Sequence, residues 1–487
     1  MPISPKLGPE AAAANMAEIA PPYTPQEAVI EANRCLFCFD APCIQSCPTG
    51  IDIPSFIKKI TTGNLLGSAR VILGANILGA SCARVCPTEV LCEGACVVLD
   101  REGDPVKIGR LQRYATDYVQ RARVPLLKAP PKKSGRRVAV IGGGPAGLGC
   151  AAELAQLGHQ VVVFEKKSQA GGLNTYGIAY YKMPPAVSLE EVELVKSLGV
   201  EFRCGVEVGK DVSIDQIQRE FDAIFVGLGL GKGARLNVAG EDLPEVIEAL
   251  EFIEQVHTRP LHEIPVGDRV AVIGGGNTAI DAVTQARRLG ARDAVIVYRR
   301  SQAEMPAYEF EQELARTDGA RFLFNVAPVA IVSDDHGHVT GLKLVRTAGA
   351  DGKVQVLPGT EFVEPFDMVI KAIGETKQAG LLKRLFPNLD LDARGVVLQN
   401  PETGQTNVPR VFVGGDCANG GREVVNAVAE GKKAARGIHA MLAGEKVAGP
   451  VQASRYGVKG VPPVGSGFDH PIRVKELEEE YYEGKRP

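Results

Sequence analysis

The sequence predicts an α/β protein in which a helical N-terminal domain precedes two Rossmann-like nucleotide-binding domains, the second inserted in the first. Three observations carry this prediction. Eight of the eleven cysteines lie between residues 35 and 96. The segment VAVIGGGPAGLGCAAELAQLG at 138–158 returns as VAVIGGGNTAIDAVTQARRLG at 270–290, and a third strand with glycines, VPRVFVGGDCANG, follows at 408–420. Repetition of a strand, a glycine turn and a helix indicates two dinucleotide-binding units.

The composition is that of an ordinary globular protein. A chain of 487 residues suggests two or three domains, and 45% hydrophobic with 23% charged residues is a usual balance. The formal net charge of -3 gives no electrostatic reason to expect nucleic acid or an anionic membrane as a partner. The N-terminus lacks a basic start followed by an apolar run, and no uninterrupted apolar stretch of about 18 residues exists. We therefore expect no membrane span and a cytoplasmic location.

Motif positions and breaks in composition divide the chain into seven segments. We expect a poorly ordered Ala- and Pro-rich arm at 1–24, a helical cysteine domain at 25–122, and a Pro- and Lys/Arg-rich linker at 123–136. Within the cysteine domain, apolar residues recur at helical spacing at 53–60 and 108–122. The first nucleotide-binding domain follows at 137–262 and returns at 381–445, the second occupies 263–380, and an extended tail covers 446–487.

The cysteine cluster has the spacing of an iron–sulfur protein. Its members are Cys35, Cys38, Cys43, Cys47, Cys82, Cys86, Cys92 and Cys96, and prolines follow Cys47 and Cys86 directly. In a cytosolic protein clustered thiols are metal ligands more often than disulfides, and a C-x2-C-x4-C-x3-C-P run is typical of cluster ligation. Zinc is the competing interpretation, but zinc sites usually pair two C-x2-C units or include histidine, and this region contains no histidine.

The first glycine motif has the context of a dinucleotide site. Gly142, Gly144 and Gly147 form G-x-G-x-x-G directly after a predicted strand and before a helix, where phosphates meet the positive end of the helix dipole. Glu165 ends the next strand, 161–165, and its carboxylate can accept hydrogen bonds from a ribose diol. The alternative is a merely structural turn.

The second glycine motif differs at the position that selects the nucleotide. Gly274 and Gly276 are present, and Ala279 replaces the third glycine. Arg299 stands where the first unit has Glu165, with Arg300 beside it. An arginine pair attracts a ribose 2′-phosphate that an acidic residue would repel, so we expect NADP(H) rather than NAD(H). The alternative is that both arginines are surface charges at a strand end.

Two further glycine segments point to the kind of dinucleotide in the first unit. Gly171-Gly172-Leu173 follows the Glu165 strand, and Gly415-Asp416 lies far downstream. This combination resembles flavoproteins of the disulfide-reductase-like superfamily, and the resemblance implies FAD with the aspartate on its ribityl chain. No cysteine pair follows either motif at C-x2-C or C-x4-C spacing, which argues against dithiol exchange of the thioredoxin reductase kind.

The cysteine domain resembles a more specific family. The runs CLFCFDAPCIQSCPTGIDIPSFI, LGASCARVCPTEVLCEGAC and IGRLQRYATDYV are similar to those of the flavin-carrying small subunit of bacterial dihydropyrimidine dehydrogenase, and the remainder also resembles the small subunit of glutamate synthase. The likeness covers about residues 20–442 and implies two [4Fe-4S] clusters. Cys35, Cys38, Cys43 and Cys96 would hold one; Cys47, Cys86, Cys92 and the side-chain oxygen of Gln112 would hold the other, with Cys82 as the alternative eighth ligand.

The same resemblance implies the nucleotide-contacting positions. For FAD they are Gly142, Gly144, Pro145, Ala146, Gly147, Glu165, Gly172, Leu173, Lys182, Gly415 and Asp416, with Lys182 where relatives carry arginine. For NADP(H) they are Gly274, Gly275, Gly276, Asn277, Thr278, Arg299, Arg300, Ala372, Ile373 and Gly374. We expect no catalytic side chain, because hydride transfer between the two cofactors needs positioning and electrostatics rather than a protein acid or base.

The expected function is that of an electron-input subunit. NADPH would be oxidised at FAD, and electrons would pass through two [4Fe-4S] clusters to a partner, an FMN and iron–sulfur barrel subunit that reduces uracil or thymine to the 5,6-dihydropyrimidine. The assembly would be a hetero-oligomer. Two alternatives stay open: the small subunit of glutamate synthase or a related NADPH-dependent oxidoreductase, and a non-catalytic assembly or cluster-carrier protein.

Overall fold

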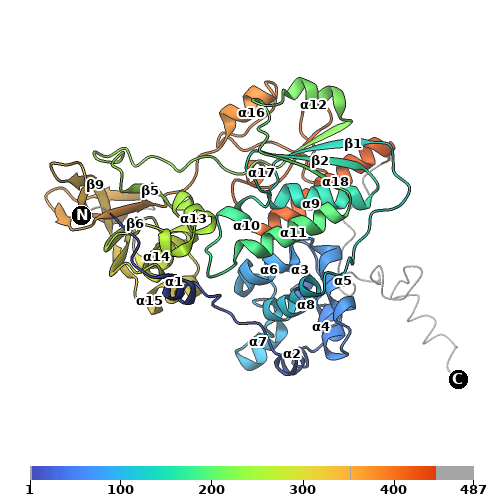
Figure 1. The fold of residues 1–487 in the computed structure, drawn as a ribbon, viewed down its shortest axis with the longest axis horizontal. Helices are drawn as coiled ribbons and strands as arrows, with labels where there is room; N and C mark the ends of the chain where they lie inside the picture. The colour runs from blue at the N-terminus through green and yellow to red at the C-terminus, as the bar shows by residue number, and fades with distance from the viewer. Residues whose placement is uncertain (1–2, 351–352, 446–487) are drawn as a thin grey trace. The chain divides into compact units, whose positions relative to one another are not determined.

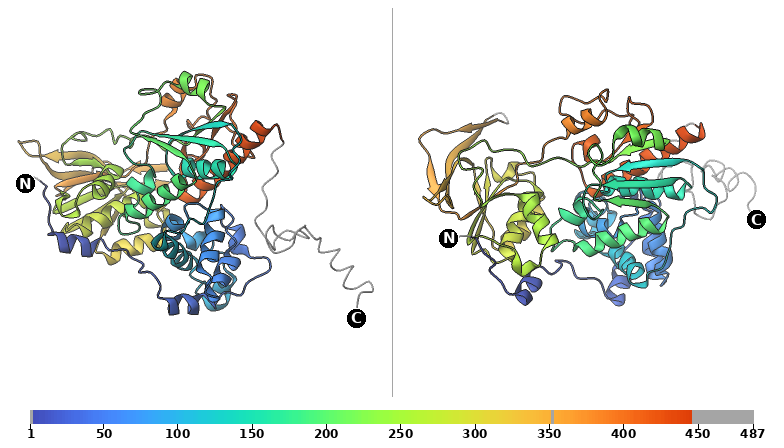
Figure 2. Two further views of the ribbon diagram at one scale, coloured as in Figure 1. Left: turned by 45° about the vertical axis from the view of Figure 1, so that its right-hand side comes forward. Right: turned by 45° about the horizontal axis from the view of Figure 1, so that its top comes forward.

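The computed structural model describes residues 3–350 and 353–445, which form two compact units. Unit 1 takes the described parts of Met1–Ile19, Thr175–Pro185 and Gly231–Thr376; unit 2 takes those of Ala20–Asn174, Ala186–Leu230 and Lys377–Pro487. The tail expected at 446–487 lies outside the described residues. The strand arrangements of the two units, shown in Figures 1 and 2, confirm the inserted α/β arrangement predicted from the sequence.

Unit 2 contains a parallel five-stranded sheet. Its order is β14 (Val411–Val413), β4 (Ala223–Val226), β1 (Arg137–Ile141), β2 (Gln160–Glu165) and β3 (Glu201–Cys204). Strand side chains alternate between two apolar cores: Val138 and Val140 face one, and Ala139 and Ile141 face the other. The late strand β14 pairs with β4, so the chain completes this sheet only after the inserted unit.

Helices cover both faces of this sheet. α9 (Pro145–Gln156), α11 (Pro185–Ser197) and α18 (Val424–Ala443) contribute to the core of Val138, while α12 (Ile214–Glu220) and α16 (Ala379–Leu385) contribute to the core of Ala139. α9 and α18 approach closely because a glycine lies at their contact. A Cβ added to Gly431 would lie 2.1 Å from the carbonyl oxygen of Ala146. The short helix α17 (Asp416–Asn419) follows β14.

The cysteine domain, also in unit 2, is built from short helices. They are α2 (Pro25–Ala32), α3 (Pro42–Gln45), α4 (Ile53–Thr61), α5 (Leu65–Ala75), α6 (Gly79–Val85), α7 (Val97–Glu102) and α8 (Ile108–Ala122). α4 and α8 confirm the two helical patterns at 53–60 and 108–122. Thr24 and Glu27 form a capping box that begins α2. Ile77 and Leu78 join the core that covers the unit 2 sheet, which attaches this domain firmly to that sheet.

Unit 1 repeats the order of four of the five strands of the unit 2 sheet; the fifth, at the edge, precedes the glycine turn in unit 1 and is the last strand of the chain in unit 2. Its parallel strands are β5 (Val246–Glu248), β13 (Met368–Lys371), β6 (Arg269–Ile273), β7 (Asp293–Tyr298) and β8 (Arg321–Phe324), with α13 (Ala249–Thr258), α14 (Asn277–Arg288) and α15 (Glu309–Thr317) packed in its core. The repeat at an offset of 132 residues is thus structural as well as sequential. An antiparallel sheet of β9 (Val326–Ser333), β10 (Val339–Ala350), β11 (Lys353–Val356) and β12 (Phe362–Glu364) was not predicted.

The N-terminal segment differs from the poorly ordered arm that its composition suggests. It forms helix α1 (Pro9–Asn15) in unit 1, with Ala12 and Met16 fully buried, and Ser4 pairs with Val266 as an isolated bridge. Burial of these apolar side chains compensates for the ordering of the chain. The largest segment of unit 1 runs from Gly231 to Thr376.

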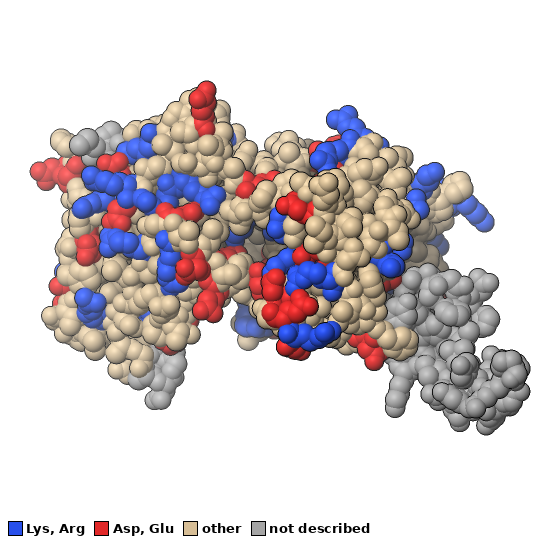
Figure 3. Space-filling view, turned by 90° about the horizontal axis from the view of Figure 1, so that it is seen from below, with Lys and Arg blue, Asp and Glu red and all other residues tan. Residues whose placement is uncertain are grey.

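The charged surface agrees with the nearly neutral composition. On the face drawn in Figure 3, Lys and Arg side chains alternate with Asp and Glu side chains. Among the helices of residues 3–350 and 353–445, none alone has the length and apolar composition of a membrane span; α5 and α6 together reach that composition, but they are bent by 87°.

Candidate cofactor sites

The first group of thiols surrounds a cavity in the cysteine domain. Its lining includes the four cysteines expected to hold one cluster, which are Cys35, Cys38, Cys43 and Cys96. Three of them come from the loop and short helix α3 near the start of the domain, and Cys96 directly precedes α7. Apolar side chains such as Ile53 and Ile57 of α4 complete the wall and keep the site dry.

The second group of thiols surrounds a neighbouring cavity. Its lining contains all four expected members of the second ligand set, Cys47, Cys86, Cys92 and Gln112, and also Cys82 and Asn76. Ile53 lines both cavities, so the two sites are separated by little more than one side chain. Val425, near the start of α18, contributes to the second cavity alone. The second cavity is therefore the one that borders the nucleotide-binding part of unit 2.

The donor chemistry of the thiols fits an iron–sulfur cluster. Burial, together with the charge of neighbouring thiols, raises the pKa of Cys35 to about 11 and that of Cys43 to about 12. Such thiols ionise at neutral pH only when a cation compensates the crowded charge. Across residues 3–350 and 353–445, no three Cys, His, Asp or Glu side chains come close enough to hold a single metal ion.

Gln112 and Cys82 compete for the last ligand position of the second cavity. The Gln112 side-chain amide donates from Nε2 to the carbonyl oxygen of Gly79 at 2.7 Å, so its Oε1 is the atom that remains for an iron. Cys82 also lines the cavity, and its thiol is in hydrogen-bond contact with that of Cys86. Both candidates are almost fully buried.

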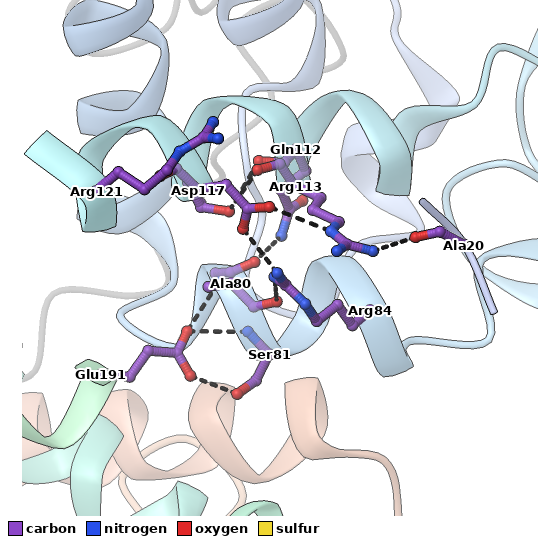
Figure 4. Close-up of polar contacts among 11 residues, drawn as sticks. Ala20, Ala80, Ser81, Arg84, Gln112, Arg113, Asp117, Arg121 and Glu191 are labelled. Carbon is purple, nitrogen blue, oxygen red and sulfur yellow. Dashed lines mark hydrogen bonds and ion pairs between the residues drawn. The ribbon is translucent and has the colours of Figure 1, made fainter. Parts of the chain in front are cut away.

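A buried carboxylate from the neighbouring sheet domain positions helix α6, which carries Cys82 and leads to Cys86. Glu191 of α11 accepts hydrogen bonds from the backbone N–H groups of Ala80 and Ser81 at 2.8 and 3.0 Å, and from the Ser81 hydroxyl (Figure 4). These contacts satisfy the first backbone donors of α6. On its other side α6 is bound to α8 by the Arg84–Asp117 ion pair at 2.8 Å.

We expect Glu191 to give the protein a measurable pH dependence. Burial raises the pKa of Glu191 to about 7, although the hydrogen bonds from Ser81 and Ala80 act in the opposite direction. The folded state therefore binds this proton more tightly than the unfolded chain, whose pKa is near 4.5, and the resulting stability is lost as pH rises from about 4.5 to about 7. Glu191→Gln, which mimics the protonated carboxyl, should remove about 3 kcal/mol of pH dependence over this window.

Thermal denaturation of anaerobic protein at several pH values checks this expectation. The melting temperature of the native protein should fall relative to that of Glu191→Gln as pH rises through the window. Glu190→Gln, an exposed neighbour on α11, is the matched control and should follow the native protein. Parallel pH profiles for the native protein and Glu191→Gln would contradict the assignment.

In the glycine turn of unit 2, the backbone conformation and packing of the protein do not require a glycine at one of the three motif positions. Gly142 has φ +102°, and a Cβ on Gly147 would lie 1.9 Å from the Gly142 carbonyl oxygen, so the fold requires both glycines. Gly144, in contrast, has an ordinary extended conformation (φ -78°, ψ -175°), and its added Cβ would meet only Gly172 Cα at 3.7 Å. Its missing side chain is explained by close approach of a phosphate to the start of α9.

The remaining expected flavin residues converge on this turn. Glu165 Oε2 accepts the Gly143 N–H at 2.8 Å, a Cβ on Gly172 would lie 2.7 Å from Gly144 Cα, and Gly415 lies against Ala146. Asp416 begins α17 directly after Gly415, and the Leu173 side chain is exposed. Pro145 is the first residue of α9. The carboxyl ends of β1, β2 and β14 thus present one continuous cradle, as FAD binding requires.

A buried amide that the sequence analysis did not single out supports the same fit. Asn174 is 0% exposed, and neither its Oδ1 nor its Nδ2 has a hydrogen-bond partner among the described residues. It follows Gly172 and Leu173 of the cradle. A buried amide without partners is unfavourable, so a bound polar group such as the flavin ring would satisfy it. Only its burial without a partner reveals this residue, and sequence carries no such signal.

In the glycine turn of unit 1, likewise, one glycine is required by the backbone and another is not. Gly274 has φ +143°, and its added Cβ would lie 2.1 Å from the Ala372 carbonyl oxygen, which brings the turn against the end of β13. Gly276 has an ordinary conformation and nothing within 4 Å of an added Cβ. The structure therefore brings together the β6 turn (Gly274, Gly275, Gly276, Asn277 and Thr278) and the segment after β13 (Ala372, Ile373 and Gly374). Gly276 therefore leaves the approach to the start of α14 open, where this motif would bring a pyrophosphate.

The arginine pair lies where a 2′-phosphate would be expected. Arg299 and Arg300 follow β7, directly beside the strand that leads to the glycine turn. Arg299 is exposed and Arg300 is half-buried. Their backbone carbonyls are tied down by the Thr347 hydroxyl at 2.9 Å and the Asn325 N–H at 3.0 Å, which holds the segment in place.

Lys182 lies in unit 1 and forms two ion pairs there. Its ammonium contacts Asp281 of α14 at 2.6 Å and Glu311 of α15 at 2.7 Å. The flavin contact that the resemblance implies for Lys182 stays a prediction.

Comparisons with known proteins agree with both cofactor regions. Residues 12–124 match the family described as "Dihydroprymidine dehydrogenase domain II, 4Fe-4S cluster", and residues 136–431 match the family described as "Pyridine nucleotide-disulphide oxidoreductase". The glutamate synthase (NADPH) small chain of Halomonas elongata is 38% identical over 447 residues, which cover 88% of this chain and 93% of that protein.

Two further comparisons concern a second relative and the fold. The NAD-dependent dihydropyrimidine dehydrogenase subunit PreT of Escherichia coli is 34% identical over 427 residues, which cover 88% of this chain and 97% of that protein. Mycobacterium tuberculosis FprA in complex with NADPH is similar in structure, with a TM-score of 0.52 and 20% identity over 66% of this chain and 88% of that chain. At that identity the likeness concerns the fold alone.

Proposed function

The chain belongs to the family of pyridine-nucleotide-dependent oxidoreductases that includes the small chain of glutamate synthase, and we propose that it is the electron-input subunit of a dihydropyrimidine dehydrogenase. It is an NAD(P)H-dependent FAD and iron–sulfur oxidoreductase. When bound, FAD would accept electron pairs from NADPH, and two [4Fe-4S] clusters would carry electrons singly to a partner subunit. The partner would be an FMN and iron–sulfur barrel protein that reduces uracil or thymine.

The position of the two thiol cavities carries this proposal. The cavity of Cys47, Cys86 and Cys92 borders α18 of the flavin-binding domain through Val425, and Ile53 separates it from the cavity of Cys35. The thiols thus form two adjoining stations that start at the flavin domain. A chain of this kind delivers electrons outward, so the substrate would be reduced on another subunit.

The protein's own residues do the binding work in this scheme. Gly144 and Gly276 leave room for the two pyrophosphates, and Glu165 presents a carboxylate to a ribose. Cys35, Cys38, Cys43 and Cys96 would hold one cluster, and Cys47, Cys86, Cys92 and Gln112 the other. Gln112 favours the dihydropyrimidine dehydrogenase subunit over the second candidate, because the resemblance to that subunit includes the glutamine of the IGRLQ run.

The small subunit of a glutamate synthase is the second candidate. The higher sequence identity to that protein than to the dihydropyrimidine dehydrogenase subunit favours it. Its partner would be a large amidotransferase in place of the FMN barrel protein.

Anaerobic affinity purification with cofactor analysis separates the two candidates. The proposal expects a co-purified subunit that contains FMN and gives NADPH-dependent loss of uracil absorbance. A large partner that forms glutamate from glutamine and 2-oxoglutarate would establish the second candidate and overturn the first. Failure of NADPH and NADH alike to bleach the flavin would overturn both.

We expect Arg299→Glu to weaken NADPH selectively. Charge-assisted hydrogen bonds to a 2′-phosphate contribute about 1.5–3 kcal/mol, so the KM for NADPH should rise about 10- to 100-fold while that for NADH stays nearly constant. Steady-state reduction of an artificial acceptor with each nucleotide measures this. Arg269→Glu, an exposed arginine at the opposite end of β6, controls for net charge. Equal losses with both nucleotides would remove the NADP(H) assignment. The preference has to be measured on this chain, because the PreT relative is named NAD-dependent.

A further inference from the structure

One buried amide of the second cavity has a donor that no group among the described residues accepts. Asn76 is the residue after α5, is 0% exposed, and lines the cavity together with Cys47, Cys86 and Cys92. Its Oδ1 accepts the backbone N–H of Leu78 at 3.0 Å. Its Nδ2 is buried and has no hydrogen-bond partner across residues 3–350 and 353–445.

The orientation of this amide follows from hydrogen-bond chemistry. The Leu78 N–H can only donate, so the atom that faces it must be the amide oxygen, and the NH₂ group is left for the cavity. The hydrogen bond from Leu78 accounts for the amide oxygen of Asn76, but no contact among the described residues accounts for its amide nitrogen. An unpaired buried N–H costs about 1–3 kcal/mol, so the position calls for an acceptor.

Cysteine sulfur supplies most of the side-chain acceptors on this wall. Apart from Asn76, Thr88 and Gln112, the side chains that line the cavity are those of cysteines and of apolar residues. A cluster bound there would add inorganic sulfide. Hydrogen bonds to cluster sulfurs stabilise the reduced state, which carries more negative charge, and so raise the reduction potential.

The donor is also held rigidly. The Asn76 backbone N–H donates to the Ile72 carbonyl at 2.8 Å. Lys432 of α18 donates from Nζ to the carbonyls of Ala75 at 2.5 Å and Gly74 at 3.3 Å, the two residues directly before Asn76. The ammonium thus anchors the end of α5 to the flavin-binding domain. A fixed dipole needs no reorganisation when the charge of a neighbouring centre changes.

We propose that Asn76 donates a hydrogen bond from Nδ2 to a sulfur atom of the second cluster and thereby raises its reduction potential. The inference rests on the proposed function, because it requires that cluster. It assigns Asn76 a positioning and electrostatic role at the station next to the flavin. The cluster that borders the flavin domain would then be the better electron acceptor, which favours transfer away from the flavin.

Redox titration of anaerobic holoprotein, monitored by electron paramagnetic resonance, tests the inference. Asn76→Asp keeps the oxygen that caps Leu78 and removes the donor, and Asn76→Leu removes the donor without adding charge. In both variants the midpoint potential of the second cluster should fall, by about 59 mV for a tenfold change in a one-electron equilibrium. The potential of the first cluster should stay constant. Asn64→Asp, an exposed asparagine that caps the other end of α5, is the matched control and should leave both potentials unchanged.

Unchanged second-cluster potentials in both Asn76 variants, with native iron content, would overturn the inference. If the variants lose iron, the native protein labelled with nitrogen-15 in its asparagine side chains decides. Pulsed resonance of the reduced second cluster should show coupling to an amide nitrogen, and its absence would equally overturn the inference. Failure of the two-cluster assignment on which the inference rests is distinguishable, because native protein would then contain about four rather than about eight iron atoms.

Discussion

Cys86→Ala is expected to abolish the second cluster and leave the first intact. Cys86 lines the cavity of Cys47 and Cys92 but not that of Cys35. A missing thiolate leaves an iron without its ligand in a cavity closed by apolar side chains, where water replaces sulfur poorly. Iron and acid-labile sulfide should fall to about half, and electron delivery to the partner should stop. Reduction of the flavin by NADPH should continue, since neither nucleotide cradle contains Cys86.

Cys82→Ala is the matched control on the same helix. Cys82 lies one helical turn before Cys86, lines the same cavity, is more buried than Cys86, and contacts the Cys86 thiol. If Gln112 completes the ligand set, Cys82→Ala keeps all iron and Gln112→Leu loses that of the second cluster. The reverse pattern would make Cys82 the ligand and would remove the residue that links this chain to the dihydropyrimidine branch.

Gly144→Ala and Gly276→Ala are expected to have large and reciprocal effects. Both glycines have conformations open to alanine, and an added Cβ meets no protein atom closer than 3.7 Å, so both variants should fold. The methyl group would occupy the path of a pyrophosphate toward the helix N-terminus. Gly144→Ala should lower FAD affinity at least tenfold, about 1.4 kcal/mol, and yield protein with clusters but little flavin. Gly276→Ala should keep the flavin and lose its reduction by NADPH.

Flavin absorbance and nucleotide-driven bleaching measure these two effects. Gly147→Ala serves as the contrast, because its Cβ would lie 1.9 Å from a backbone oxygen and the turn itself would be disrupted. Native flavin content in Gly144→Ala would show that this turn does not hold a pyrophosphate. Loss of flavin in Gly276→Ala would show that the two cradles were assigned in the wrong order.

The repeated units and the cysteine inventory could be predicted from the sequence because their signals are local. A strand, a glycine turn and a helix follow one another within about twenty residues, and the first glycine of each turn, Gly142 or Gly274, is required by a positive φ angle. The arm at 1–24 and the antiparallel sheet of β9 to β12 had no such signal. Helix α1 is ordered by burial of Ala12 and Met16 against residues far away in sequence.

Lys182 and Asn76 show where sequence reasoning ends. The ion pairs of Lys182 with Asp281 and Glu311, which come from two other helices, have no signal in the sequence. Nothing in the spacing of Asn76 distinguishes it from Asn64 at the other end of α5; only burial beside the thiols and an unpaired Nδ2 do.

The amino-acid sequence by itself determined the kinds of cofactor that this chain can hold, because closely spaced cysteines and glycine turns are properties of neighbouring residues. Tertiary packing alone decided which cavity borders the flavin domain and which buried polar groups are left unsatisfied. Those features depend on contacts between segments that are distant in sequence, and the free energy of each contact exists only once the chain has folded.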